Sequence, residues 1–191
     1  MAKIYIMQTG RTTWGDESRA ESMAGCPLSK EGAEKVQAAA EQLPAGEIKA
    51  IYAGAGEAEH QTAALVAGKL KLRARTCKDL HEFDYGLWQG LTLQEIKRRQ
   101  PKVYKQWMEQ PASVRPPGGE TLQEAQERLR KALKGIVKGR KGEPVLLVLG
   151  PLATGLIRCL LQGEAVNSYW QHVDRSFAWC SYDVTGGDES L

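Results

Sequence analysis

The first ten residues constrain the fold of this chain more than any other stretch. Residues 4–7 form an apolar run without polar alternation, which predicts a strand buried on both faces of a sheet. The run ends abruptly at Gln8, Thr9 and Gly10. In open α/β sheets, ligands bind beyond the carboxyl ends of such strands. Gln8 and Thr9 therefore lie either at the floor of a crevice or in a plain turn, and this stretch by itself favours the turn.

Segments with strand and helix patterns alternate along the chain. We expect strands over 48–53, 72–80, 145–149 and 177–184, the second of them weaker, and helices over 29–43, 57–70 and 151–161. Identical Thr-Leu-Gln-Glu tetrapeptides at 92–95 and 121–124 match the capping box and predict two more helix starts. This alternation predicts a three-layer α/β/α sandwich with a mostly parallel central sheet. We expect one domain over 1–185 and a flexible acidic tail over 186–191.

Composition excludes several classes of protein. The 191 residues are 42% hydrophobic and 26% charged, as in ordinary globular proteins, and a net charge of +3 is too small to argue for nucleic acid or an anionic membrane. The basic regions 97–105 and 131–141 are expected to be solvated helix faces. No apolar run approaches the roughly 20 residues of a membrane span, and charged Lys3 argues against a signal peptide. We expect a cytoplasmic protein.

Cysteines and histidines give no metal-binding pattern. The four cysteines are scattered without a C-x-x-C pair, and the chain has only three histidines. We therefore expect reduced thiols, no metal site and no cofactor.

Five segments, taken in order, resemble those of a known family. They are P-L-S-x-x-G with Q-A (27–38), I-Y leading to T-A (51–63), E-F-D-Y-G-L-W-Q-G (82–90), P-P-G-G-E-T (116–121) and V-L-G-P with a following apolar helix (148–163). Together they resemble the histidine phosphatase superfamily, whose fold is that of phosphoglycerate mutase. The resemblance covers nearly the full length and implies the same α/β sandwich.

The resemblance also assigns site positions, and most of them carry other residues here. The family's first arginine is replaced by Gln8, its histidine nucleophile by Thr9, its asparagine by Gly15, its second arginine by Ala58 and its second histidine by Gly150. Glu82 stands at the position of the family's acid. Gly10, Arg11 and Thr12 are further candidates for the crevice. Arg11 replaces a usually acidic residue, and we favour a solvent-facing position over one that lends charge to the crevice.

These replacements act against phosphoryl transfer. Its catalysis is mostly positioning and electrostatic stabilisation, and a charge-assisted hydrogen bond contributes about 1.5–3 kcal/mol. Without two arginines and a histidine, several kcal/mol of phosphate affinity are missing, and the Glu82 carboxylate repels a phosphate dianion. Thr9 would need an adjacent base to act as nucleophile, and neither Gln8 nor Gly150 can serve. Glu82 is equally well explained as a structural carboxylate that caps a neighbouring loop.

Other histidines are not expected to substitute. His60 follows Ala58 by two residues on the same expected helix, which turns it about 200° away from the crevice. His81 points to the side opposite its neighbour Glu82 in an extended segment. His172 lies in the C-terminal connection, where nothing ties it to the site.

The sequence thus favours a catalytically inactive pseudoenzyme that acts as a binding, scaffolding or regulatory module for an unknown small molecule or protein. Two alternatives stay open: an enzyme of altered chemistry with Glu82 as acid or base, and a residual phosphomonoesterase of low rate. A deep crevice with convergent polar groups favours altered chemistry, whereas a crevice filled by side chains favours the pseudoenzyme. The ligand, the partner and the oligomeric state are left open.

Overall fold

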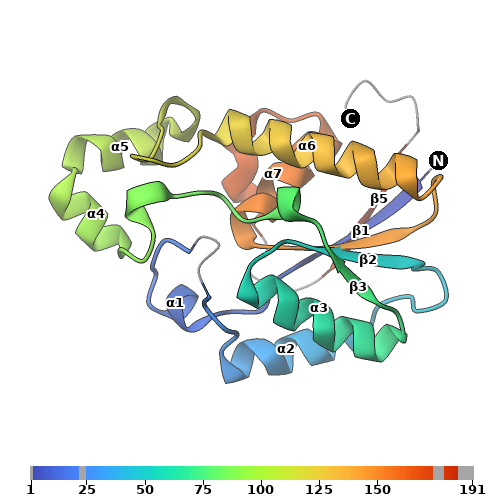
Figure 1. Ribbon diagram of the computed structural model, residues 1–191. Coiled ribbons are helices and arrows are strands. Elements are labelled where there is room, and N and C mark those ends of the chain that lie inside the picture. The colour runs from blue at the N-terminus through green and yellow to red at the C-terminus, as the bar shows by residue number, and fades with distance from the viewer. Residues whose placement is uncertain (1, 22–24, 174–178, 185–191) are drawn as a thin grey trace.

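The fold is built on a central five-stranded sheet, seen in a computed structural model that describes residues 2–21, 25–173 and 179–184. The strands are β1 (Ala2–Gln8), β2 (Ala50–Ala53), β3 (Ala74–Thr76), β4 (Val145–Leu149) and β5 (Cys180–Val184), in the order β3-β2-β4-β1-β5. All neighbours pair in parallel except β5, which is antiparallel to β1 (Figure 1). The expected α/β fold with a mostly parallel sheet is confirmed.

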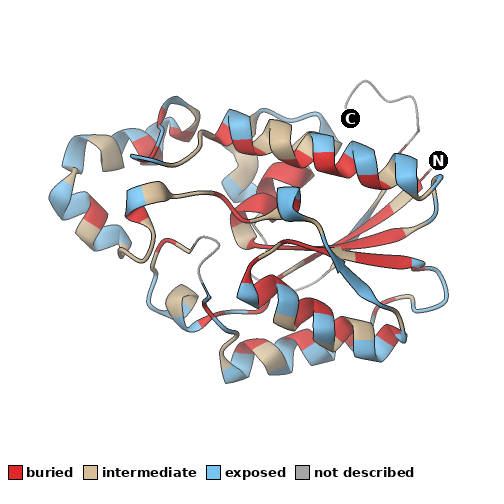
Figure 2. Ribbon diagram, in the orientation of Figure 1, coloured by how far each residue is buried: buried red, intermediate tan, exposed pale blue. Residues whose placement is uncertain are grey.

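Each face of the sheet is covered by two long helices. Ile6 and Leu147 point into a core formed with α6 (Leu122–Gly139) and α7 (Pro151–Gln162). Met7 and Val148 point to the other face, where α2 (Lys30–Glu41) and α3 (Glu57–Leu70) cover them. Every residue of β4 is buried, which explains why its sequence shows no polar alternation (Figure 2).

The remaining elements are short. They include α1 (Thr13–Asp16), α4 (Leu93–Arg99), α5 (Pro101–Glu109) and the 3-10 helices η1 (Lys78–Leu80), η2 (Gly86–Trp88), η3 (Pro111–Ser113) and η4 (Val166–Gln171). Helices α4 and α5 stand away from the sheet (Figure 1) and hold the buried Trp107 against Phe83 and Trp88. Both expected capping boxes form, at Thr92 with Glu95 and at Thr121 with Glu124. Local sequence therefore fixes where α4 and α6 begin.

Three predictions about local structure need correction. The strand expected over 72–80 is short, because β3 is an exposed edge of the sheet and the chain turns into η1 directly after it. The polar loop 11–27 contains α1, whose first turn is capped when the Thr12 hydroxyl accepts the Gly15 N–H (2.9 Å). The last strand begins at Cys180. Residues 177–178 and the expected acidic tail 186–191 lie outside the described residues.

Among the described residues, no helix combines the length and apolar character needed to cross a membrane.

Candidate functional site at the strand tips

The carboxyl ends of three parallel strands meet at one edge of the sheet. The Thr9 N–H donates to the Leu149 carbonyl (2.8 Å) and the Gly54 N–H donates to the Val148 carbonyl (3.2 Å), so the tips of β1, β2 and β4 are joined. A cavity of about 20 Å³ lies there, room for about one water molecule. Its lining consists of Thr9, Glu21, Cys26, Glu57, Ala58, Glu59, Glu82, Gly150 and Pro151. The structure thus brings together four of the expected positions: 9, 58, 82 and 150.

Glu82 caps α7, whose N-cap Gly150 and first residue Pro151 also line this cavity. Its carboxylate accepts the N–H groups of Leu152 (2.9 Å) and Ala153 (3.0 Å) in the first turn of α7, and of Phe83 (2.5 Å). The N-cap residue of α7 is Gly150, which has no side chain to do this. Glu82 is 4% exposed, and this burial raises its pKa to about 8, opposed by the three N–H groups and reinforced by the nearby Glu59 carboxylate.

A shielded ion pair fixes the segment that carries Glu82. The Arg128 guanidinium donates to the carbonyls of Asp79 (2.7 Å) and His81 (3.0 Å), just before Glu82 in the chain. The same guanidinium binds both oxygens of Glu120, at 2.7 and 3.2 Å. The backbone position of Glu82 is therefore determined by α6 rather than by the cavity.

Three glycines leave the space that three carboxylates occupy. A Cβ atom added at Gly15 would lie 2.6 Å from a carboxylate oxygen of Glu21. A Cβ at Gly56 would lie 2.2 Å from an oxygen of Glu59, and one at Gly150 would lie 2.2 Å from an oxygen of Glu82. Burial also raises the pKa values of Glu21 and Glu59. Cations would normally accompany such groups, but the described lining contains no Arg, Lys or His.

Sequence reasoning missed Glu21 and Glu59. The available signal was indirect, because a glycine at position 15 or 150 in place of a larger polar residue leaves a void that another side chain must fill. The identity of the filling residue depends on where the folded chain places Glu21 and the start of α3 relative to the strand tips, which the sequence pattern does not specify.

The expected crevice residues 10 to 12 do not line the cavity. The Gly10 N–H donates to the Thr62 hydroxyl (3.1 Å), and a Cβ at Gly10 would lie 2.9 Å from the Gly32 carbonyl oxygen, so this residue packs β1 against α2 and α3. Arg11 is exposed and pairs with Asp16 (3.5 Å), so it faces solvent as favoured from the sequence. The chain turns outward here into α1, and these residues support the cavity rather than form it.

Two other candidates lie beside the cavity. Gln8 ends β1 and is half-buried without lining the cavity. Gly15 lies in α1 and reaches the cavity through the Glu21 side chain that occupies its missing Cβ space.

The three histidines stay away from the described lining, as expected. His60 is exposed and contacts the Thr76 hydroxyl (3.1 Å), and the His81 ring binds the Glu82 carbonyl (2.6 Å). His172 contacts the Glu164 carboxylate (2.8 Å).

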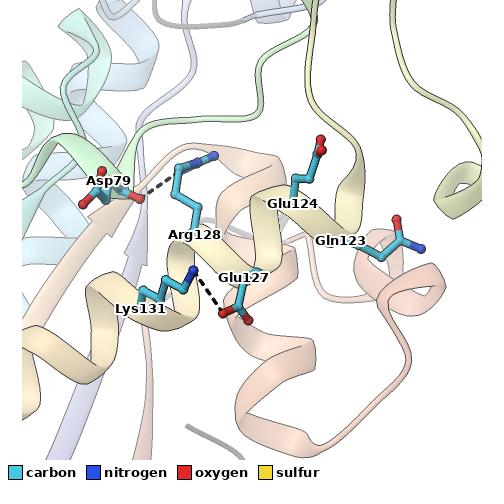
Figure 3. Close-up of a pocket in the computed structure, with 6 residues that line it drawn as sticks. All are labelled: Asp79, Gln123, Glu124, Glu127, Arg128 and Lys131. Atoms are coloured by element: carbon cyan, nitrogen blue, oxygen red, sulfur yellow. Dashed lines mark hydrogen bonds and ion pairs between the residues drawn. The ribbon is translucent and has the colours of Figure 1, made fainter.

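A wider hollow of about 510 Å³ lies on α6, outside the strand tips (Figure 3). It is lined by Asp79, Gln123, Glu124, Glu127, Arg128 and Lys131. Arg128 is engaged with the Asp79 carbonyl, and Lys131 lies 3.5 Å from Glu127 (Figure 3). Charges of both signs lie side by side here, which is typical of a solvated helix face, and Lys131 is the one residue of the basic region 131–141 in the lining given above.

Comparisons with known proteins agree with this architecture. Residues 4–191 match the model of the histidine phosphatase superfamily, branch 1. The chain is 30% identical over 175 residues to bifunctional protein Rv2228c of Mycobacterium tuberculosis, which covers 90% of the chain but about half (48%) of that relative's length.

Two further matches extend over most of both chains. Phosphoserine phosphatase 1 of Hydrogenobacter thermophilus is 23% identical, with 89% of this chain and 81% of that protein covered. The solved structure of YhfR from Bacillus stearothermophilus superimposes with a TM-score of 0.91 at 24% identity, covering 98% of this chain and 93% of the other. The chain therefore belongs to the histidine phosphatase superfamily, branch 1.

Proposed function

We propose that this protein is a catalytically inactive member of its superfamily that works as a binding, scaffolding or regulatory module. Superfamily members are phosphatases and mutases. One observation carries the proposal: the cavity at the strand tips measures about 20 Å³, and three of its side chains are buried or half-buried carboxylates with no cation in the described lining. We further propose a cytoplasmic location and an unidentified small-molecule or protein partner.

Size and charge of the cavity both oppose a phosphate ester. A space for about one water molecule does not admit a phosphoryl group with its oxygens. Any of Glu21, Glu59 and Glu82 that is ionised would repel the dianion, and the neutral form, which burial favours by raising the pKa of each carboxyl, supplies no positive charge to bind it. Phosphoryl transfer needs cations at this place to stabilise the charge of the transition state.

Thr9, at the position of the family's nucleophile, is not hydrogen-bonded to a base among the described residues, although Glu21, Glu59 and Glu82 line the same cavity. It is 3% exposed, and no described base accepts a proton from its hydroxyl. Glu82 is a poor substitute as acid or base, since both its oxygens already accept backbone N–H groups and the cavity leaves no room for a substrate beside it. These contacts favour the inactive module over an enzyme of altered chemistry.

The proposal is tested by assaying the purified chain against simple phosphate monoesters and by rapid quench for a trapped phosphoenzyme. We expect no turnover and no phosphoenzyme, and Thr9→Ala should change neither result. Phosphoserine phosphatase 1 of Hydrogenobacter thermophilus, assayed with phosphoserine in parallel, is the positive control for the conditions.

Two outcomes would contradict inactivity in different ways. Turnover abolished by Thr9→Ala would identify a residual phosphomonoesterase that uses this residue. Turnover that survives Thr9→Ala but disappears in Glu82→Gln would instead identify altered chemistry at the tips.

A further inference from the structure

Three side chains of metal-binding type gather at the end of α7 opposite the strand tips. Cys159 Sγ, a Glu164 carboxylate oxygen and a His172 ring nitrogen all lie within 4.8 Å of one another. Cys159 is nine residues beyond Gly150 in the same helical direction, so this cluster is about 13 Å from the tip cavity. No catalytic position suggested by the sequence belongs to it.

The backbone holds these three residues in place. Gly163 ends α7 with a left-handed conformation (φ 68°), and the Glu164 N–H then donates to the Cys159 carbonyl (2.9 Å). The Arg158 guanidinium donates to the His172 carbonyl (2.9 Å), which fixes the end of η4 against α7. Packing is close along this contact, because a Cβ at Gly155 would lie 2.5 Å from the Tyr169 carbonyl oxygen. Contacts of the protein itself therefore hold together the segments that carry the three side chains.

The donor set suits zinc. Zinc binds thiolate, imidazole and carboxylate in tetrahedral sites, at about 2.3 Å to sulfur and about 2.0–2.2 Å to nitrogen or oxygen. Ligand atoms in such a site are roughly 3.3–3.7 Å apart, by the geometry of those bond lengths. His172 Nε2 and Glu164 Oε2 are now 2.8 Å apart, so a small side-chain adjustment would open the pair around an ion. Harder cations such as Mg²⁺ prefer oxygen ligands throughout.

The three side chains differ in their exposure to solvent, which leaves a path by which a metal ion can enter. Cys159 is fully buried, the His172 side chain is 15% exposed and the Glu164 side chain 41% exposed. The protein thus supplies three ligands and leaves a fourth position open toward solvent, where a water molecule can complete the tetrahedron.

We propose that Cys159, Glu164 and His172 form a zinc site that clamps η4 to the end of α7. No sequence pattern marks this site, because the three ligands are spaced as C-x₄-E-x₇-H and come from the end of a helix and the end of a 3-10 helix. Binding must release the thiol proton, since burial and then the Glu164 carboxylate raise the pKa of Cys159 to about 11. The site is independent of the proposed loss of catalysis.

The test is zinc titration of the full chain against a chromophoric chelator, with cobalt(II) as a spectroscopic probe. We expect one equivalent of zinc, a cobalt–thiolate charge-transfer band and a melting temperature that rises with zinc. His172→Gln and Cys159→Ala should each weaken zinc binding at least about tenfold. His60→Gln and Cys77→Ala are matched controls from outside the cluster and should leave the affinity unchanged.

Cys159 is buried, so Cys159→Ala could also destabilise the fold. His172→Gln and Glu164→Gln change side chains nearer the surface and keep the test decisive. Zinc bound equally well by the parent and by His172→Gln, or a cobalt spectrum without the thiolate band, would overturn the proposal. The three residues would then be a histidine–carboxylate pair beside a core thiol.

Discussion

Arg128 on α6 links two shielded carboxyl groups that are stabilised in opposite ways: it binds Glu120 directly, and it binds the carbonyls just before Glu82. The side chain of Glu120 is 15% exposed, and its two oxygens accept from Nε and Nη2 of Arg128. Glu82 is 4% exposed, accepts only backbone N–H groups and has no described cation beside it. The difference shows two ways of accommodating a shielded carboxyl group. Glu120 is paired with an arginine, whereas the carboxyl groups at the strand tips have no cation in the described lining, and their burial favours the neutral form.

The largest expected loss of stability at a single pH comes from breaking the paired carboxylate. Arg128→Ala leaves Glu120 shielded without its partner and removes two hydrogen bonds to the segment before Glu82. We expect the free energy of unfolding, measured by urea denaturation, to fall by about 3 kcal/mol, as for the loss of one partner from a buried pair. Arg128→Lys keeps the charge without the planar fork and should give an intermediate loss.

Arg130→Ala is the control for this effect on the same helix. Arg130 pairs with Glu127 at 2.8 Å, but their side chains are 34% and 44% exposed. Its removal should cost less than about 1 kcal/mol. Equal losses for the two variants would mean that the Arg128–Glu120 pair contributes no more than an ordinary surface pair.

The buried carboxyl group of Glu82 should make the stability of the protein depend on pH. The folded pKa of Glu82, about 8, lies above its ordinary value of 4.5. Between these values the folded chain keeps a proton that the unfolded chain releases, so stability is full below pH 4.5 and falls as the pH rises through 8. The free energy of unfolding should be measured from pH 4.5 to 8.5 for the parent and for Glu82→Gln. Its decrease over this range should be smaller in the variant, by on the order of 2–4 kcal/mol.

Glu124→Gln is a control with the opposite sign. Hydrogen bonding to Arg115 lowers the pKa of Glu124 to about 2, so its contribution is present above pH 4.5 and lost only in stronger acid. This variant should therefore keep the parent slope between pH 4.5 and 8.5. A Glu82→Gln variant with the same slope as the parent would show that the buried carboxyl stays ionised on its three N–H groups.

Much of the fold was predictable because it follows from local patterns. The apolar residues of β1 and β4, the helix 57–70 and the caps at Thr92 and Thr121 depend on neighbours in the sequence. The resemblance also pointed to four positions that the structure gathers around one cavity. The edge strand β3 was the weakest element because its residues are exposed and pack on little.

The rest of the site depends on contacts between distant residues. Glu82 caps α7 from 70 residues away, and no local signal marks such a contact. Glu21 and Glu59 enter the cavity because Gly15 and Gly56 leave them space. A glycine in the sequence indicates that a side chain is missing at that place in the structure. Which other side chain fills the space is determined only by the folded chain.

The smallest expected effect concerns the start of α6, where the cap is local rather than remote. The Thr121 hydroxyl accepts the Glu124 N–H (3.2 Å), whereas α7 relies on Glu82 for its first turn. Thr121→Ala should lower the free energy of unfolding by about 1 kcal/mol, and Thr121→Ser, which keeps the hydroxyl, should be nearly neutral. Neither variant should alter the slope of stability against pH from 4.5 to 8.5, because neither touches the buried carboxyl.

Thr121 directly follows Glu120, so the same variant also tests how separate the local cap is from the ion pair. If the first turn of α6 frayed far enough to release Glu120 from Arg128, the loss would approach that of Arg128→Ala. We expect it to stay well below, because Arg128 lies two turns further along α6 and also binds the carbonyls of Asp79 and His81. A loss of about 3 kcal/mol in Thr121→Ala would show instead that cap and ion pair form one cooperative unit, and that the segment carrying Glu82 is held by the helix start as a whole.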